Sequence, residues 1–314
     1  MDDPGHRKIH EKPVPLAGGL AVLTGVLAPT LLACLVVWLD SGGSGFDERS
    51  LQPRPNSEPL LQIPLLRPHA AFLLRHGLDV RARQLAAILF GAIGMLVVGV
   101  LDDKHELRPG RKFIGQFLVA LLVAVSGIRI TLFVPNLLFS YAVTILWIIT
   151  VINAFNFMDN MNGLCVGLGA ISSWYFAMSA AASGQYLVGL IAFLTSGALL
   201  GFLPYNFPRA VAFLGDGGSH LVGFLLSVLA ILPHFYTRLH PRRWAVLIPL
   251  IILAVPLLDL VYVVVLRWRL KQPFYQGDTN HLSHRLVRLG LTRTTAVLLI
   301  WCGAALFGLL VFLC

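Results

Sequence analysis

Long apolar segments separated by short polar ones dominate the chain. Each apolar segment approaches the ~20 residues that an α-helix needs to cross the hydrocarbon core of a bilayer. The pattern therefore predicts an all-α, polytopic integral membrane helical bundle, organised as one domain over residues 1–314. We predict nine transmembrane helices, at 15–39, 84–101, 113–130, 137–152, 164–182, 186–203, 218–235, 244–266 and 294–314.

The polar connections fall on two faces if these helices alternate in direction. One face carries 1–14, 102–112, 153–163, 204–217 and 267–293, with 14 of the 24 Lys and Arg residues. That excess of positive charge places this face in the cytoplasm. The long connection 40–83 then forms an extracytoplasmic loop, with short helical pieces expected around 68–76.

Composition supports the membrane assignment and excludes other classes. Hydrophobic residues make up 57% of the chain and charged residues only 12%, far from the average of soluble domains. The net charge of +9 fits anionic lipid headgroups and phosphorylated substrates better than a nucleic acid. The four cysteines lie in or at the ends of predicted helices without paired spacing, so neither a disulfide framework nor a zinc site is expected.

Four short polar segments, called islands, carry the candidate chemistry. The first is the acid pair Asp102 and Asp103, which follows a predicted transmembrane helix. Two adjacent carboxylates repel each other, which favours either a bound cation or a raised pKa suited to a general base. The alternative is a solvated loop that simply ends the helix. Adjacent acids alone do not decide between these interpretations.

The second island spaces Asn153, Asn156, Asp159 and Asn162 three residues apart. On a regular helix each step of three drifts backwards by roughly 60°, so the first and last side chains would face opposite sides. If all four serve one pocket, the backbone must leave helical geometry near 160–163. Capping of the next helix would explain one of these residues but not all four.

Glycines surround an acid in the third island, Gly215-Asp216-Gly217-Gly218-Ser219. Glycine permits close backbone approach, the helix that follows offers N–H groups to an anion, and the Asp216 carboxylate suits a divalent cation. The alternative is that the glycines only permit tight helix packing.

Cationic side chains recur at helical spacing in the fourth island, within 267–293. A short amphipathic helix at the membrane surface would place on one face His281, His284, Arg285 and Arg288, with Leu282, Leu286 and Leu289 on another and Gly290 at its end. Such a stripe matches a pyrophosphate, since Arg binds phosphate bidentately. The alternative is a basic face that contacts lipid headgroups.

Asp259 stands apart from the islands because it lies inside an apolar run. An unpaired charge is costly there, so we expect a partner or a position towards the cytoplasmic end. Its role is open between structure and function.

Taken in order, these motifs resemble the polyprenyl-phosphate N-acetylhexosamine-1-phosphate transferase family (glycosyltransferase family 4), and most closely its undecaprenyl-phosphate N-acetylglucosaminyl-1-phosphate transferase branch. The resemblance extends over 2–295 and begins with Asp2-Asp3-Pro4 and Arg7-Lys8-Ile9-His10. Members usually have a further helix before this opening motif, so we expect that first helix to be absent from the sequence. Two departures are Asn162, where bacterial members usually have Asp, and Ser283, where a His is common.

The resemblance implies transfer of an N-acetylhexosamine 1-phosphate, with GlcNAc the expected sugar, from a UDP-N-acetylhexosamine to undecaprenyl phosphate, with release of UMP. It places the protein in the bacterial cytoplasmic membrane with the active site facing the cytoplasm, and leaves a homodimer open. The implied cofactor is Mg²⁺, with Mn²⁺ as an alternative, held by Asn156 and Asp216. The implied catalytic residues are Asp102, Asp103 and Asp159. The implied substrate-binding residues are Lys8, His10, Asn153, Asn162, His281, His284 and Arg285.

Two other functions remain as alternatives. A cation- or proton-coupled transporter would use the acids as a relay, but a relay needs acids at several depths and these cluster at helix ends. An inactive relative acting as a membrane partner is favoured by the residue at position 162 and by the missing first helix. Within the enzyme hypothesis, direct attack is simplest, and a two-step route through an aspartyl phosphate stays open.

Overall fold

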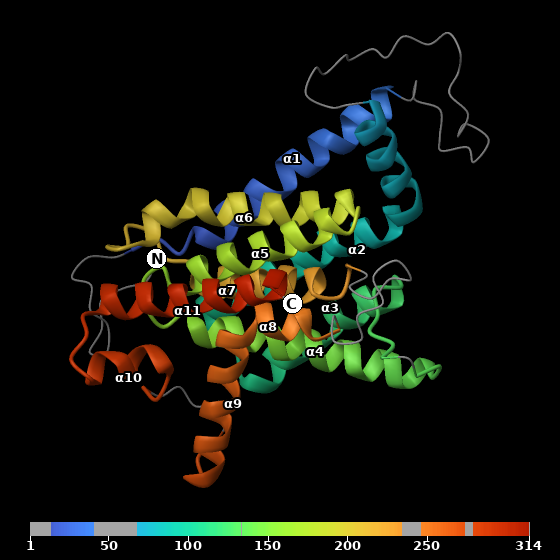
Figure 1. Cartoon of the computed structure of the whole chain (residues 1–314). Helices are drawn as coiled ribbons and strands as arrows, with labels where there is room; N and C mark the ends of the chain where they lie inside the picture. The colour runs from blue at the N-terminus through green and yellow to red at the C-terminus, as the bar shows by residue number, and fades with distance from the viewer. Residues whose placement is uncertain (1–13, 41–67, 133, 234–245, 274–278, 314) are drawn as a thin grey trace.

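The computed structural model describes residues 14–40, 68–132, 134–233, 246–273 and 279–313. Lys8 and His10 lie outside the described residues. In the described part the chain forms helices and no strand, as the apolar pattern predicted (Figure 1). The helices are α1 (Gly18–Asp40), α2 (Pro68–His105), α3 (Pro109–Val125), α4 (Leu137–Met158), α5 (Leu164–Ala182), α6 (Tyr186–Asn206), α7 (Gly215–Leu229), α8 (Ile248–Ile252), α9 (Ala254–Arg269), α10 (Leu282–Arg288) and α11 (Arg293–Leu313).

Six helices in the described part are long and apolar enough to cross a bilayer, which supports a multi-pass membrane protein. They are Gly18–Val36, Arg81–His105, Leu137–Met158, Leu164–Ala182, Tyr186–Asn206 and Arg293–Phe312. The other three predicted spans are helical but shorter than 18 residues, in α3, α7 and the pair α8 and α9. The break between α8 and α9 at Leu253 has a local cause, because Pro256 has no N–H to donate to the carbonyl of Ile252.

Helix α2 begins at Pro68, well before the predicted start at residue 84. Helical structure therefore covers the last part of the connection predicted for 40–83, including 68–76, where short helical pieces were expected. Residues 41–67 of that connection lie outside the described part.

Helix α7 forms the centre of the bundle. Fourteen of its 15 residues are buried, including the polar residues Ser219, His220 and Ser227. It packs against α2 and α4, and Gly99 of α2 makes the contact with α7 possible. A Cβ atom on Gly99 would lie 2.4 Å from the backbone oxygen of Asp216, so the two backbones approach as closely as small residues permit.

The backbone leaves helical geometry after α4, where the sequence required a break only if all four polar residues of the second island served one pocket. Asp159 ends the helix, residues 159–163 form turns, and Gly163 has a φ of 76°. The N–H of Gly163 donates to the side-chain oxygen of Asn206 at 2.8 Å, which ties this turn to the end of α6. The predicted amphipathic helix is present as α10, and Gly290 follows it with a φ of 98°.

Candidate functional site

Asp103 joins the end of α2 to the start of α7. Its carboxylate accepts hydrogen bonds from the backbone N–H of Asp216 at 2.8 Å and of Gly217 at 3.0 Å. These are the N–H groups that the sequence offered to a bound anion, and the protein's own carboxylate takes two of them. A carboxylate at a helix N-terminus is stabilised by the unpaired donors and by the helix dipole. Asp103 therefore fixes where the third island meets the first.

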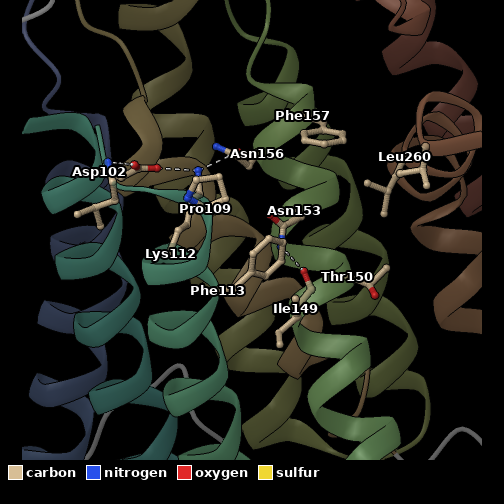
Figure 2. Close-up of a pocket in the computed structure, with 12 residues that line it drawn as sticks. Asp102, Pro109, Lys112, Phe113, Ile149, Thr150, Asn153, Asn156, Phe157 and Leu260 are labelled. Atoms are coloured by element: carbon tan, nitrogen blue, oxygen red, sulfur yellow. Dashed lines mark hydrogen bonds and ion pairs between the residues drawn. The ribbon is translucent and has the colours of Figure 1, made fainter. Parts of the chain in front are cut away.

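A lysine ammonium lies among the oxygens of three different islands. The Nζ of Lys112 is 2.7 Å from Asp102 Oδ2, and it donates to Asn156 Oδ1 at 3.3 Å (Figure 2). The same Nζ lies 3.6 Å from Asp216 Oδ2. Residues from α2, α3, α4 and α7 thus meet around one positive charge. Lys112 was not predicted as a site residue, because nothing in its local pattern separates it from the cations Lys104, Arg108 and Arg111 nearby.

The two central side chains of the site hold each other directly. Asn156 Nδ2 donates to Asp216 Oδ1 at 2.7 Å and to Ser219 Oγ at 3.0 Å. Asn156 Oδ1 and Asp216 Oδ2 are left facing the Lys112 ammonium. The Asp102 carboxylate is held by a second contact, because its Oδ1 accepts a hydrogen bond from the N–H of Leu107 at 2.9 Å.

Asn153 and Asn162 diverge from Asn156 even though the backbone leaves helical geometry after α4. Asn153 lies one turn deeper, and its Nδ2 donates to Gln116 Oε1 and to the carbonyl of Ile149, both at 2.8 Å. Asn162 is exposed in the turn after α4 and donates to the carbonyl of Pro208 at 3.3 Å. The polar residues of the second island therefore contact different parts of the protein instead of converging on one pocket.

Asp159 lies in the same turn with an unusual pKa. Burial, and then the charges of Asp216 and Asp103, raise the pKa of its carboxyl to about 8. Asp159 therefore holds a proton at neutral pH unless a cation lies nearby.

The raised pKa of Asp159 makes the stability of the folded protein depend on pH. The folded protein binds the Asp159 proton more tightly than the unfolded chain, in which the carboxyl titrates near its ordinary value of about 4. The stabilisation is fully present below pH ~4 and is lost as the pH rises through the folded pKa of about 8. Without divalent cations, we expect the melting temperature of the wild type to fall relative to Asp159→Asn between pH 5 and pH 9. Parallel melting curves for the two proteins would contradict the raised pKa.

Helix α10 packs against α11. Its side chains also contact α9 and the turn after α4, and these contacts divide the predicted cationic stripe. His281 is buried, and its Nδ1 lies 2.7 Å from Oδ2 of Asp259. Asp259 thus has the partner that its position required. Arg285 is exposed, with its guanidinium 4.5 Å from the ring centre of Tyr262 in α9. On the predicted apolar face, Leu289 is 81% exposed, so that face is shorter than expected.

His284 and Arg288 complete the stripe on the outer side of α10. His284 is half-buried and Arg288 is exposed. Burial lowers the pKa of His284, and the charges of Arg293 and Arg288 act in the same direction. His281 is therefore the member of the stripe that faces inwards, and the other three lie towards the surface.

A pocket opens between α3, α4 and α9, and Figure 2 shows it with polar groups at one end. The polar end includes Asp102, Lys112, Asn153 and Asn156, and the remaining wall is largely apolar. The apolar lining residues are Leu107, Pro109, Phe113, Ile149, Phe157, Leu260 and Val264.

The residues present fit a magnesium ion at the junction of α4 and α7. In the described part of the chain no three His, Cys, Asp or Glu residues cluster as metal ligands. Asn156 Oδ1 and Asp216 Oδ2 already converge on a positive charge, the Lys112 ammonium. Hard oxygen donors of this kind suit Mg²⁺, which usually keeps water and substrate phosphate as its other ligands. The set would also accept Mn²⁺.

Comparison with known proteins gives a consistent result. The profile of glycosyl transferase family 4 matches residues 85–234. A Bacillus subtilis (strain 168) protein named as a probable undecaprenyl-phosphate N-acetylglucosaminyl 1-phosphate transferase is 30% identical, over 98% of this chain and 75% of its own. The decaprenyl-phosphate N-acetylglucosaminephosphotransferase of Mycobacterium leprae (strain TN) is also 30% identical, over 97% and 75%. The undecaprenyl-phosphate alpha-N-acetylglucosaminyl 1-phosphate transferase of Escherichia coli (strain K12) is 26% identical, over 98% and 74%.

Proposed function

The chain belongs to glycosyl transferase family 4 and is a phosphotransferase, and we propose that it transfers N-acetylglucosamine 1-phosphate from UDP-N-acetylglucosamine to undecaprenyl phosphate, releasing UMP. The observation that carries the proposal is the pocket in which Asp102, Lys112 and Asn156 adjoin an apolar wall. The reaction would take place at the cytoplasmic face of a bacterial inner membrane and start a lipid-linked cell-envelope glycan.

The acceptor is a phosphate on a long hydrocarbon chain, and the pocket has a place for each part. The Lys112 ammonium lies where it can donate to a phosphate oxygen at the polar end. Phe113, Ile149 and Leu260 supply apolar surface beside it. Val264, at the α9 side, is 38% exposed, so a hydrocarbon chain can leave between the helices towards lipid. An apolar pocket with a few convergent polar groups is the usual form of a small-molecule site.

In the proposed reaction, an oxygen of the acceptor phosphate attacks the phosphorus that bears the sugar. The new O–P bond forms as the bond between that phosphorus and the UMP phosphate oxygen breaks, and UMP takes the electron pair. A phosphomonoester has a second pKa near 6, so the acceptor needs little help to lose its proton. Lys112 would offset charge on the transferred group, and Asp102 would orient Lys112.

Asn156 and Asp216 would hold Mg²⁺, which supplies positive charge to the donor diphosphate when bound. Asp103 would hold the start of α7 in place, so that Asp216 keeps its position beside Asn156. Asp159, next to this pair, would complete its negative surroundings. Asn162 would bind the uracil, because its Nδ2 is on the carbonyl of Pro208 and its Oδ1 remains available to a uracil N–H.

The test uses membranes that contain the protein, with undecaprenyl phosphate, Mg²⁺ and radiolabelled UDP-N-acetylglucosamine. We expect label to enter the butanol-extracted lipid with release of an equal amount of UMP. Membranes prepared in the same way without the protein are the control. Absence of labelled lipid with every UDP-N-acetylhexosamine supplied would contradict the proposal, and would favour an inactive relative.

A further inference from the structure

Asp259 is buried in α9 and has no part in the transfer described above. Only 4% of its surface is exposed, and both carboxylate oxygens are used. Oδ1 accepts from the backbone N–H of Leu282 at 2.6 Å, and Oδ2 lies 2.7 Å from Nδ1 of His281. A residue that only capped α10 would need the first of these bonds. The second oxygen is committed to one nitrogen of one histidine.

This contact determines which nitrogen of His281 carries the proton. An ionised carboxylate can only accept hydrogen bonds, so Nδ1 must be the donor. When Nδ1 carries the only ring proton, Nε2 keeps its lone pair, and it has no hydrogen-bond partner among the described residues. A carboxylate that fixes the tautomer of a histidine in this way is a recurring device in enzymes.

Two further contacts hold His281 in place, one to its ring and one two residues along the chain. Its centre lies 5.4 Å from that of Phe157, with the two planes at 70°, and Phe157 lines the pocket. The next residue but one, Ser283, donates to Asn160 Oδ1 at 2.6 Å. Asn160 directly follows Asp159 in the turn after α4. Asp259, Phe157 and Asn160 therefore hold His281 at the edge of the site.

We propose that Asp259 is a positioning residue for sugar-phosphate transfer. It holds His281 with its proton on Nδ1, so that Nε2 can accept a hydrogen bond from a hydroxyl or amide N–H of the donor sugar. This inference rests on the proposed function, because it assigns a partner to His281 within that reaction. The lone pair is the relevant feature, since a hydroxyl or N–H can donate to it and an ionised phosphate oxygen cannot.

The test variant is Asp259→Asn, which keeps the shape of the side chain. The asparagine oxygen can still accept from the N–H of Leu282, and its amide nitrogen then donates to Nδ1 of His281. The histidine proton therefore moves to Nε2, and the acceptor is lost. We expect kcat/KM for UDP-N-acetylglucosamine to fall about 10- to 100-fold, the usual range for a partner that orients a functional side chain. The KM for undecaprenyl phosphate should stay within about twofold, because the acceptor pocket is unchanged.

A double-mutant cycle separates positioning from a general structural role. In a His281→Ala background, Asp259→Asn should cost less than about twofold, because the residue it acts through is already gone. His281→Asn is the matched control, since its amide nitrogen can still donate to Asp259 while Nε2 is absent. It should keep the melting temperature of the wild type and lose activity as His281→Ala does. Equal costs of Asp259→Asn in both backgrounds would overturn the inference.

Chemical modification of His281 tests the proposed tautomer even if the transfer assay shows no activity. Diethyl pyrocarbonate modifies the unprotonated nitrogen of a neutral imidazole, and mass spectrometry of peptides quantifies the product. We expect slow modification of His281 in the wild type and several-fold less in Asp259→Asn, where Nε2 carries the proton. His284, on the same short helix, is the internal control and should react equally in both. Unchanged or absent modification of His281 would overturn the inference, whereas an inactive wild type would overturn only the proposed function.

Discussion

Asp216→Ala is expected to abolish transfer, with a loss of at least about a thousandfold in kcat, or about 4 kcal/mol of transition-state stabilisation. The carboxylate has two roles in the site. One oxygen accepts from Asn156 at 2.7 Å, and the other faces the positive charge of Lys112 at 3.6 Å. Alanine removes both the proposed ion ligand and the group that holds Asn156. The measurement is the rate of labelled lipid formation at saturating UDP-N-acetylglucosamine.

Two further variants separate this chemical loss from unfolding. Asp216→Asn keeps an oxygen for Asn156 and removes the charge, so it should fold and melt as the wild type while remaining nearly inactive. Glu106→Gln removes a carboxylate from the exposed connection after α2, at the same end of the bundle. It should keep activity within about twofold, as expected for a surface change. Full activity of Asp216→Asn would remove the proposed role of the carboxylate in holding a metal ion.

Gly99→Ala is expected to give the largest loss of stability, about 3 kcal/mol, at the upper end of the range for overpacked sites. The new methyl group would lie 2.4 Å from the backbone oxygen of Asp216 and 2.4 Å from Cα of Gly217. Both contacts are to backbone, which cannot rotate away as a side chain can. Relief would separate α2 from α7 and would pull Asp103 away from the N–H groups of Asp216 and Gly217. Stability and activity should therefore fall together.

The matched control is Gly197→Ala in α6. A Cβ atom there would meet nothing within 4 Å, so the substitution only changes helix propensity. Alanine is favoured over glycine inside a helix by roughly 0.5–1 kcal/mol, and the variant should melt at or above the wild-type temperature. Thermal unfolding of the detergent-purified proteins, followed by size-exclusion chromatography, measures both effects. Equal melting of Gly99→Ala and the wild type would show that α2 and α7 are not packed as described.

The helices were predictable because a chain that crosses lipid must pair all its backbone N–H and C=O groups with one another, as a helix does. Its side chains must also be apolar along the whole length of the crossing. The sequence required a turn after α4 only if four polar residues at a spacing of three served one pocket. The turn is present, but Asn153 and Asn162 bond to different neighbours. The break before α9 follows from Pro256.

The candidate site was predicted only in part. The sequence placed polar islands at one end of the bundle, and contacts between Asp103 and α7, between Asn156 and Asp216, and between Ser283 and Asn160 confirm that they meet. It did not identify Lys112, whose place depends on how α3 packs beside α2 and α4. It also treated His281 and Arg285 as equal members of one stripe, although one is buried and the other exposed.

The sequence by itself determined that this protein is a helical membrane bundle with acid, amide and basic groups at the helix ends. Hydrophobic length and motif order are properties of consecutive residues, so they can be read without the fold. Only the tertiary structure decided which polar and charged groups pair with one another. Lys112 pairs with Asp102, which is 10 positions away in the chain, and Asp259 pairs with His281, which is 22 positions away. Such pairing depends on distances of a few ångströms between separate helices, because the strength of an interaction between charges falls with their separation and with exposure to water.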